Sequence, residues 1–208
     1  MAENNFASQV TLRPATGADR SQILALLPYL ADFLIPPTRQ AEHLWAGDAE
    51  MAEAVLAGKA KSSFIDVATD VDDRIRGLIM VSLREEMLSH EPSAHLEAIV
   101  VEPNARGTGL GKRLMKHCEQ RVRNLGAKSL TLHVFASNER ARVLYAAQEF
   151  DEELIRAIKW LDLSARYLNH NRYLRGILRT RSQLSNPNRV LRGAEYQSSQ
   201  TKHFRVPH

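Results

Sequence analysis

The sequence predicts an α/β (α+β) fold in one globular domain, and three local patterns support this prediction. A strand-like run at residues 10–13 is followed by a capping turn and by apolar residues at helical spacing. Two further strand-like runs are separated only by a short acidic turn, which favours an antiparallel pair. A later strand ends at Pro103, directly before a glycine-rich turn and a helix. The 208 residues, of which 44% are hydrophobic, suffice to bury one core.

The predicted elements alternate along the chain. Thr16 and Asp19 have the spacing of a capping turn that opens the first helix, and the prolines at residues 36–37 end that region. Gly58 and Gly126 stand where the next two helices are expected to end. In order, we expect a strand at residues 10–13, a helix carrying Ile23 to Leu30, a helix at 41–56, strands at 63–68 and 75–83, a loop at 89–94, a strand at 95–101, the helix after the glycine turn, a strand at 129–134, a helix from Asn138 to about Gln148, and a last strand at 154–161.

The helix after the glycine turn is predicted to be amphipathic. Apolar side chains recur at helical spacing along it, so they share one face that should pack on the sheet. These residues are Leu110, Leu114, Met115, Cys118, Val122 and Leu125.

Charge is distributed unevenly and divides the chain into three parts. We expect an N-terminal segment at residues 1–9, one globular domain at 10–162 and a basic extension at 163–208 that is partly helical or disordered. The extension holds nine Lys and Arg against one acid, Glu195, a net charge of +8, whereas the first 162 residues hold 19 against 23, a net charge of −4. A basic tail suits nucleic acid, the ribosome or an acidic lipid surface, but a merely solvated extension explains the composition too.

Composition excludes several classes of protein. No run of about eighteen apolar residues occurs, and the first nine residues lack the pattern of a secretory leader, so we expect a soluble cytoplasmic protein with no membrane partner. The single cysteine, Cys118, cannot form an internal disulfide. It shows no metal-ligand spacing with the eight histidines, so no metal site is predicted.

The glycine-rich turn, Arg106-Gly107-Thr108-Gly109-Leu110-Gly111, is the clearest functional signal. Because glycine has no side chain, a glycine-rich turn between a strand and a helix exposes backbone N–H groups and a helix N-terminus to an anion. This arrangement predicts a phosphate site. A P-loop would require Gly-Lys-Ser/Thr at the end of the turn, but Gly111 is followed by Lys112 and Arg113. A dinucleotide fingerprint would require a glycine where Lys112 stands. Both alternatives therefore fail on spacing.

Two linked motifs resemble the GNAT superfamily of N-acetyltransferases. Arg106-x-x-Gly109-x-Gly111 is similar to that family's Arg/Gln-x-x-Gly-x-Gly/Ala signature, and Asn138-x-x-Ala141-x-x-Leu144-Tyr145 is similar to its second conserved patch. The resemblance covers roughly residues 10–162. It implies a central mixed, mostly antiparallel twisted sheet that splays at the acetyl-CoA site and is flanked by helices. The chain departs from the family where Glu149, rather than glycine, precedes Phe150, which puts the turn into the last strand and the acceptor side in doubt.

The resemblance also implies the residues of the acyl-donor site. In the family the loop amides bind the pyrophosphate of coenzyme A, and the preceding strand pairs with its pantetheine arm. Asn138 would either bind pantetheine or cap the helix that follows it. The implied donor-site residues are Ile99, Val100 and Val101 beside the thioester, and Arg106, Gly107, Thr108, Gly109, Leu110, Gly111 and Lys112 around the pyrophosphate.

Acetyl transfer to an amine requires a base for the ammonium proton and an acid for the departing thiolate. Tyr145 is the predicted acid, because family enzymes with Asn and Tyr seven positions apart place that tyrosine at the coenzyme sulfur. Glu97 is the first candidate base, by its similarity to the proposed base of polyamine acetyltransferases. His133 is the second and His95 the third, and a water relay through any of them remains open.

The implied activity is transfer of the acetyl group of acetyl-CoA to a primary amine by direct attack in a ternary complex, since no cysteine stands near the motifs to carry the acyl group. The acidic body favours a cationic acceptor, a small molecule or a peptide amine, and Tyr29, Phe33 and Trp45 either line its pocket or pack in the core. The alternative is an acetyl-CoA-binding regulatory module that contacts RNA or the ribosome weakly through its basic tail. A homodimer is also among the expected assemblies.

Overall fold

The structure of the protein is a computed structural model that describes residues 9–161. The basic extension predicted at residues 163–208 and all but the last residue of the N-terminal segment lie outside this range. Both therefore stay predictions, as does the nucleic-acid contact through the extension.

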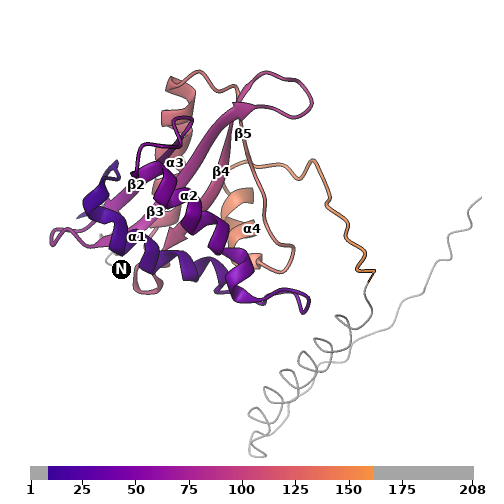
Figure 1. Cartoon of the computed structure of the whole chain (residues 1–208), viewed down its shortest axis with the longest axis horizontal. Coiled ribbons are helices and arrows are strands. Elements are labelled where there is room, and N and C mark those ends of the chain that lie inside the picture. The colour runs from indigo at the N-terminus through magenta and orange to yellow at the C-terminus, as the bar shows by residue number, and fades with distance from the viewer. Residues whose placement is uncertain (1–8, 162–208) are drawn as a thin grey trace, which may run out of the picture.

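A single five-stranded sheet forms the centre of the described domain (Figure 1). The first four strands pair antiparallel with their neighbours in sequence order, and the fifth pairs parallel with the fourth. The prediction of a mixed, mostly antiparallel sheet flanked by helices is thus confirmed. The strands are β1 (Thr11–Pro14), β2 (Ser63–Thr69), β3 (Ile75–Glu85), β4 (Pro92–Val101) and β5 (Ser129–Leu132).

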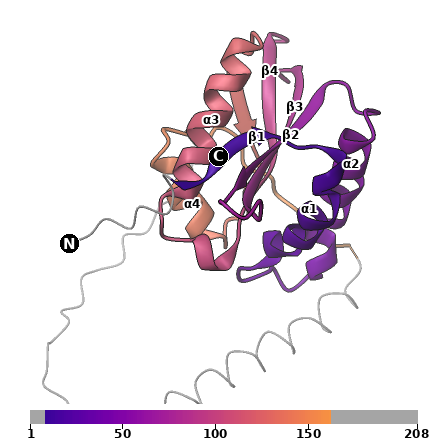
Figure 2. The same ribbon diagram turned by 90° about the vertical axis from the view of Figure 1, so that its left-hand side faces the viewer.

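Helices cover both faces of this sheet, with α1 and α2 on one side and α3 and α4 on the other (Figure 2). None of the helices within residues 9–161 is both long and apolar enough to cross a membrane. The α-helices are α1 (Arg20–Leu26), α2 (Ala46–Leu56), α3 (Leu110–Asn124) and α4 (Glu139–Ala146), and the short 3-10 helices are η2 (Gly17–Asp19), η3 (Leu27–Ala31), η4 (Ala41–Leu44) and η5 (Pro103–Ala105).

Two apolar clusters lie on opposite faces of the sheet, because successive side chains of a strand point to opposite sides. On β3, Ile79 and Val81 belong to the cluster under α3 and α4, whereas Leu78 and Met80 belong to the cluster under α1 and α2. Five of the six residues predicted for the apolar face of α3 are buried. The prediction was wrong for Leu125, which is 52% exposed because the helix ends at Asn124.

The region predicted as one helix over residues 41–56 is divided in two. Trp45 has φ −142° and ψ −13°, outside the helical region, so η4 ends before it and α2 begins after it. The Trp45 carbonyl still accepts the first hydrogen bond of α2, from the Ala49 N–H at 2.9 Å. The spacing of the apolar residues could not reveal this break, because the segments on both sides of Trp45 are helical.

The last predicted strand, residues 154–161, is the largest error in the fold. The structure assigns no strand to residues 151–161, and Leu154, Ile155 and Leu161 are exposed there. A strand forms only where a partner supplies its hydrogen bonds, and no part of the described chain pairs with the free edge of β5. The β-like composition of this segment could not reveal the missing partner.

Smaller differences concern element ends. The predicted loop at residues 89–94 is shorter, because β4 begins at Pro92, where it pairs with Glu85 of β3. The strand predicted at 129–134 ends at Leu132, and the helix predicted to reach Gln148 ends at Ala146. The early end of β5 matters for the site, because it leaves one edge of β4 unpaired beyond Leu96.

Candidate active site

Strand β4 has two neighbours along only half of its length. Its first half pairs with β5 from Ser93 opposite Ser129 to Leu96 opposite Leu132. Beyond Leu96, β4 continues to Val101 with β3 as its only partner in the described chain. Because backbone groups of successive residues point to opposite edges of a strand, only alternate residues between Ala98 and Val101 present N–H and C=O groups on the open β5 side, where an extended ligand could pair with them.

A β-bulge between β3 and β4 lies at the point where β5 stops pairing with β4. Val81 pairs with Leu96 and Met80 with Ala98, so Glu97 is an extra residue without a partner in β3. As a result Leu96 faces the α3 side of the sheet, whereas Ala98, two residues later, faces the α1 side. Bulges of this kind redirect side chains and are common beside active sites. This one brings the Glu97 side chain into a cleft.

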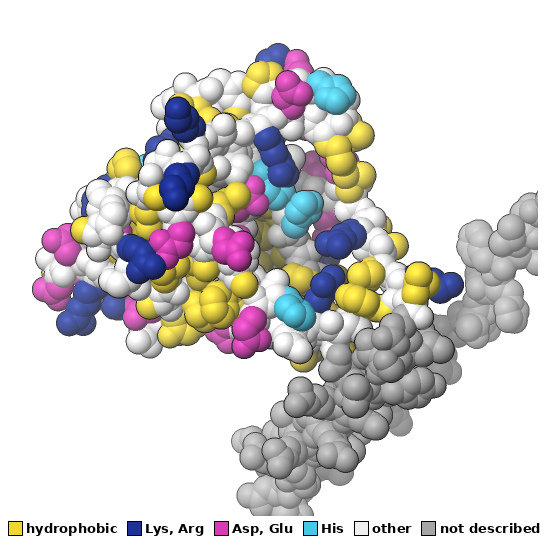
Figure 3. All heavy atoms as spheres, in the orientation of Figure 1, with side chains coloured by type: hydrophobic (Ala, Val, Ile, Leu, Met, Phe, Trp, Pro, Cys, Tyr) yellow, Lys and Arg dark blue, Asp and Glu magenta, His cyan; other side chains and the backbone are white. Residues whose placement is uncertain are grey.

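The cleft has a volume of about 430 Å³ and extends from the open half of β4 to the N-termini of α3 and α4. Figure 3 shows a hollow on one face of the molecule, with acidic, basic and histidine side chains around it. The structure brings all of the predicted site residues except Thr108 and His95 to this cleft. They are Glu97, Ile99, Val100, Val101, Arg106, Gly107, Gly109, Leu110, Gly111, Lys112, His133, Asn138 and Tyr145.

The glycine turn is shaped by backbone conformations that favour glycine. Gly107 has φ +75° and Gly109 has φ +86°, both in the left-handed region. Thr108 does not line the cleft and instead donates a hydrogen bond from its hydroxyl to the Ala105 carbonyl at 2.7 Å. Thr108 therefore holds the turn in shape.

Helix α3 begins at the cleft with its amides unused. The first helical hydrogen bond from within α3 runs from the Arg113 N–H to the Gly109 carbonyl, at 3.1 Å. The N–H groups of Leu110, Gly111 and Lys112 precede it and have no acceptor within the helix. Together with the helix dipole, they make the start of α3 a favourable place for a phosphate.

Gly111 serves packing as well as access to the backbone. A Cβ atom at this position would lie 3.4 Å from Leu144 Cδ2 of α4 and 3.8 Å from Val101 Cγ2 of β4. Both distances are ordinary van der Waals contacts, so Gly111 lies where α3 packs closely against α4 and β4.

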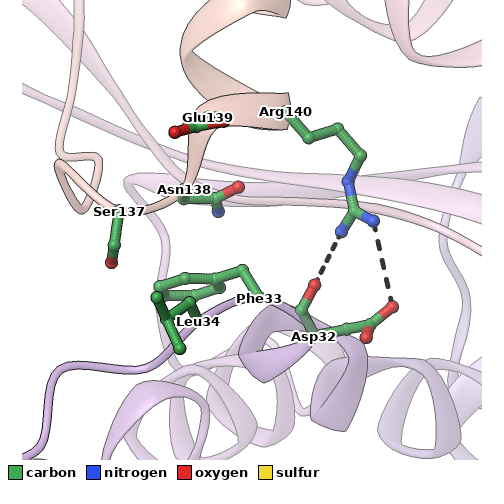
Figure 4. Close-up of a pocket in the computed structure, with 7 residues that line it drawn as sticks. All are labelled: Asp32, Phe33, Leu34, Ser137, Asn138, Glu139 and Arg140. Atoms are coloured by element: carbon green, nitrogen blue, oxygen red, sulfur yellow. Dashed lines mark hydrogen bonds and ion pairs between the residues drawn. The ribbon is translucent and has the colours of Figure 1, made fainter. Parts of the chain in front are cut away.

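Basic side chains gather at the same end of the cleft. The Arg106 Nε donates to the Val101 carbonyl at 3.1 Å, and its guanidinium forms an ion pair with the Asp32 carboxylate, which holds the pKa of Asp32 below its usual value. Arg140 donates to the Asp32 carbonyl at 3.1 Å, and Figure 4 shows its guanidinium reaching across the adjoining pocket to Asp32. Asp32 thus links the end of η3 to both arginines. Sequence reasoning identified neither Asp32 nor Arg140.

Asn138 caps α4. Its side-chain oxygen accepts a hydrogen bond from the Ala141 N–H at 3.2 Å, so the capping alternative is confirmed. The residue also lines the cleft.

Tyr145 lies in the cleft wall on α4 and is 9% exposed. Its ring packs against Phe150, with the ring centroids 5.8 Å apart. Burial raises the pKa of Tyr145 to about 12, because the charged phenolate would lose its hydration. No group in residues 9–161 forms a hydrogen bond with its hydroxyl. The phenol is thus neutral at physiological pH, with its proton available to a ligand.

The three candidate bases occupy different environments. Glu97 and His133 line the cleft, whereas His95 lies behind it and is only 3% exposed. The His95 Nδ1 is 2.7 Å from the Thr131 hydroxyl oxygen, and its ring centroid is 4.7 Å from that of His133. Burial, assisted by the charges of Arg84 and His133, lowers the pKa of His95 to about 4. Such an imidazole is a weak proton acceptor, which favours Glu97 and His133.

Asp48 is a cleft residue that sequence reasoning missed. It lies in the first turn of α2, and burial, followed by the negative charge of Glu97, raises its pKa to about 6. No motif surrounds it, and it stands 49 positions before Glu97 in the sequence. Of the three aromatic residues considered for the acceptor side, Tyr29 and Phe33 line the cleft, whereas Trp45 packs against the core under α1 and α2.

Curated proteins with similar sequences are N-acetyltransferases by name. The chain is 28% identical over 105 residues to the [Ribosomal protein bS18]-alanine N-acetyltransferase of Salmonella typhimurium, a match that covers 50% of this chain and 67% of that protein. It is 43% identical over 47 residues to the uncharacterized N-acetyltransferase YycN of Bacillus subtilis, covering 23% of this chain and 30% of YycN.

Solved structures share the fold at low sequence identity. The BH1408 protein of Bacillus halodurans, in a tetramutant form, has a TM-score of 0.60 at 17% identity and covers 73% of this chain and 99% of its own. The aminoglycoside 6'-N-acetyltransferase AAC(6')-Ih of Acinetobacter baumannii has a TM-score of 0.56 at 17% identity, covering 74% and 99%. At these identities the likeness concerns the fold alone.

A family model also matches part of the sequence. The model of the acetyltransferase (GNAT) family matches residues 28–150, which include the open strand, the glycine turn and Tyr145. The match spans more than half of the chain. This protein therefore belongs to the acetyltransferase (GNAT) family.

Proposed function

We propose that this protein is an N-acetyltransferase that transfers the acetyl group of acetyl-CoA to a primary amine by direct attack in a ternary complex. The observation that carries the proposal is the open half of β4, which ends beside the unused amides of α3 in one cleft. An extended amide-bearing chain that ends in a pyrophosphate complements both features. Family membership supports the same donor.

On this proposal, each part of acetyl-CoA has complementary groups. The pyrophosphate binds the amides of Leu110, Gly111 and Lys112, with Lys112 and Arg106 supplying positive charge nearby. The pantetheine arm, which contains two amides, runs along the open edge of β4 from Ala98 to Val101. The acetyl group then lies near the bulge, between β4 and α4.

The chemical step needs one base and one acid. Glu97, or His133 as the second candidate, accepts a proton from the ammonium group, directly or through water. The neutral amine attacks the thioester carbonyl, forming the C–N bond and leaving an additional proton on the nitrogen. The nitrogen loses this proton to water as the C–S bond breaks, which yields the neutral amide. Tyr145 donates its proton to the departing thiolate sulfur. Tyr145 regains a proton from solvent, and the base releases its own. No cysteine lines the described cleft, so the acyl group passes directly from donor to amine.

A primary amine as acceptor is consistent with the names of the relatives. One is named for the alanine of a ribosomal protein and another for the 6' position of an aminoglycoside. The non-catalytic alternative lacks a specific observation in its favour, whereas Tyr145 and the two candidate bases line the same cleft as the donor-binding groups.

Two measurements test the proposal on the full-length protein. Calorimetry should detect binding of acetyl-CoA, and a screen of primary amines should find one that makes release of free coenzyme A thiol dependent on the protein. Absence of acetyl-CoA binding would sink the donor site. Binding without thiol release for any amine would favour the regulatory module instead.

A further inference from the structure

Two carboxylates in the cleft lack the partners that other buried acids of this protein have. Asp19 accepts hydrogen bonds from Arg13 at 2.8 Å, and Asp66 binds both His117 and Arg121. By contrast, no described residue forms a hydrogen bond or an ion pair with Asp48 or Glu97. Both side chains are nevertheless partly buried.

The two carboxylates are also close enough to interact. Asp48 enters the cleft from α2 and Glu97 from the bulge of β4, and the charge of Glu97 contributes to the raised pKa of Asp48. Two partly buried like charges without a cation destabilise each other. A ligand that brings positive charge would remove this repulsion.

Charge is segregated within the cleft. Arg106, Lys112 and Arg140 line the end where α3 and α4 begin, whereas the two carboxylates lie toward α2. The basic end suits the phosphates of the donor. The acidic end is therefore left for an acceptor of opposite charge, and the apolar side chains of Leu30 and Leu44 beside it suit a methylene chain.

We infer that Asp48 determines acceptor specificity: the acceptor is an aliphatic di- or polycation whose second cationic group pairs with Asp48 while its reacting amine lies at Glu97. This inference rests on the proposed acetyltransferase function. Two carboxylates balance two cationic groups, which distinguishes this class from a peptide N-terminus carrying a single ammonium group. Asp48 acts by positioning the acceptor and takes no part in bond formation.

A matched pair of amines tests the inference by binding alone. 1,4-Diaminobutane and butylamine share a four-carbon chain and differ in the second ammonium group. In calorimetry on the full-length protein saturated with coenzyme A, the diamine should bind roughly tenfold more tightly, as expected for one additional charged hydrogen bond. Equal affinities for the two amines would overturn the inference.

Two variants assign the effect to Asp48. Asp48→Asn should reduce the affinity for 1,4-diaminobutane to that for butylamine. Glu50→Gln removes an exposed carboxylate from the same helix outside the cleft and should change neither affinity. If Asp48→Asn keeps the tenfold preference, or if Glu50→Gln abolishes it equally, Asp48 does not select the acceptor.

Kinetics separate failure of this inference from failure of the proposed function. With 1,4-diaminobutane as substrate, Asp48→Asn should raise KM roughly tenfold and leave kcat and acetyl-CoA affinity nearly unchanged. Equal turnover of butylamine and the diamine, or turnover of a peptide amine alone, would refute the acceptor class and leave the acetyltransferase intact. Loss of acetyl-CoA binding in the wild type would instead refute the proposed function.

Discussion

Both halves of β4 are β-strand, but their environments differ. From Ser93 to Leu96 the strand has neighbours on both edges, and these four residues are at most 3% exposed. From Glu97 to Val101 one edge is open, and buried residues alternate with partly exposed ones. The first half belongs to the scaffold and the second to the cleft. Strand edges are usually blocked or covered, so an edge kept open inside a cleft indicates a ligand that completes it.

The largest effect on stability should come from a core substitution in the packing under residues 93–96 of β4. Leu114 of α3 is fully buried in the cluster that contains Ala94 and Leu96. Leu114→Ala should lower the free energy of unfolding by about 3 kcal/mol, from lost burial and a residual cavity. Urea unfolding measures the change, and acetyl-CoA affinity of the folded variant should stay the same. Lys116→Ala, exposed on the same helix, is the control and should change stability by less than about 0.5 kcal/mol.

Tyr145 tests the chemistry at the open half. Tyr145→Phe removes only the hydroxyl and should lower kcat by roughly 100-fold, because the thiolate then leaves without a proton donor. Stability and acetyl-CoA affinity should remain near wild type, since no hydrogen bond from that hydroxyl to residues 9–161 is lost. Single-turnover kinetics would isolate the chemical step. A wild-type rate there would make Tyr145 a packing residue of α4.

Gly109 tests whether the turn beside the open half binds the donor. Its φ of +86° is strained for a β-branched residue, so Gly109→Val should distort the turn and its amides. Acetyl-CoA affinity should fall roughly 30-fold, equivalent to about 2 kcal/mol of strain and lost contacts. Calorimetry provides the measurement. Gly17→Val, at a glycine of negative φ with open space around its Cβ position, is the control. Unchanged affinity in a folded Gly109→Val protein would remove the donor site from this turn.

The ion pair between Asp19 and Arg13 of β1 tests a part of the scaffold outside β4. Hydrogen bonds from Arg13 lower the pKa of Asp19 from 3.8 to about 2. Because the folded value lies below the unfolded one, the stabilisation is fully present above about pH 4 and is lost as the pH falls toward 2. Asp19→Asn should therefore be less stable than wild type at pH 7, by roughly 1 to 2 kcal/mol, and the difference should shrink at pH 2. A difference that is independent of pH would contradict this assignment.

The smallest effect is expected from removing the residues beyond the domain. All the described residues that line the cleft fall between Tyr29 and Tyr145. A chain that ends at Leu163 should thus remain folded and bind acetyl-CoA with an unchanged Kd. Circular dichroism and calorimetry check both points. Unfolding or loss of binding would show that the domain boundary proposed at residue 162 is wrong.

Local signals predicted much of the molecule. The glycine turn requires a left-handed backbone and free backbone amides, and its glycines indicate both in the sequence. The apolar face of α3 repeats at the helical period and was predicted at five of its six positions. The residues of the two motifs and Glu97 were likewise found to share one cleft.

Other features depended on pairing between distant segments. The bulge at Glu97 exists because β3 and β4 shift register there, and no property of Glu97 itself requires it. Residues 154–161 have the composition of a strand but no partner in the described chain. Asp48 and Asp32 reach the site from segments whose local sequence carries no catalytic pattern.

The sequence alone therefore determined the family, the donor motif and the alternation of helices and strands, since each depends on residues close together in the chain. Only the tertiary structure decided which half of β4 stays open, which carboxylates share the cleft and which histidine is too buried to act as a base. Those properties depend on register, burial and charge between segments tens of residues apart, which are set when the whole chain packs.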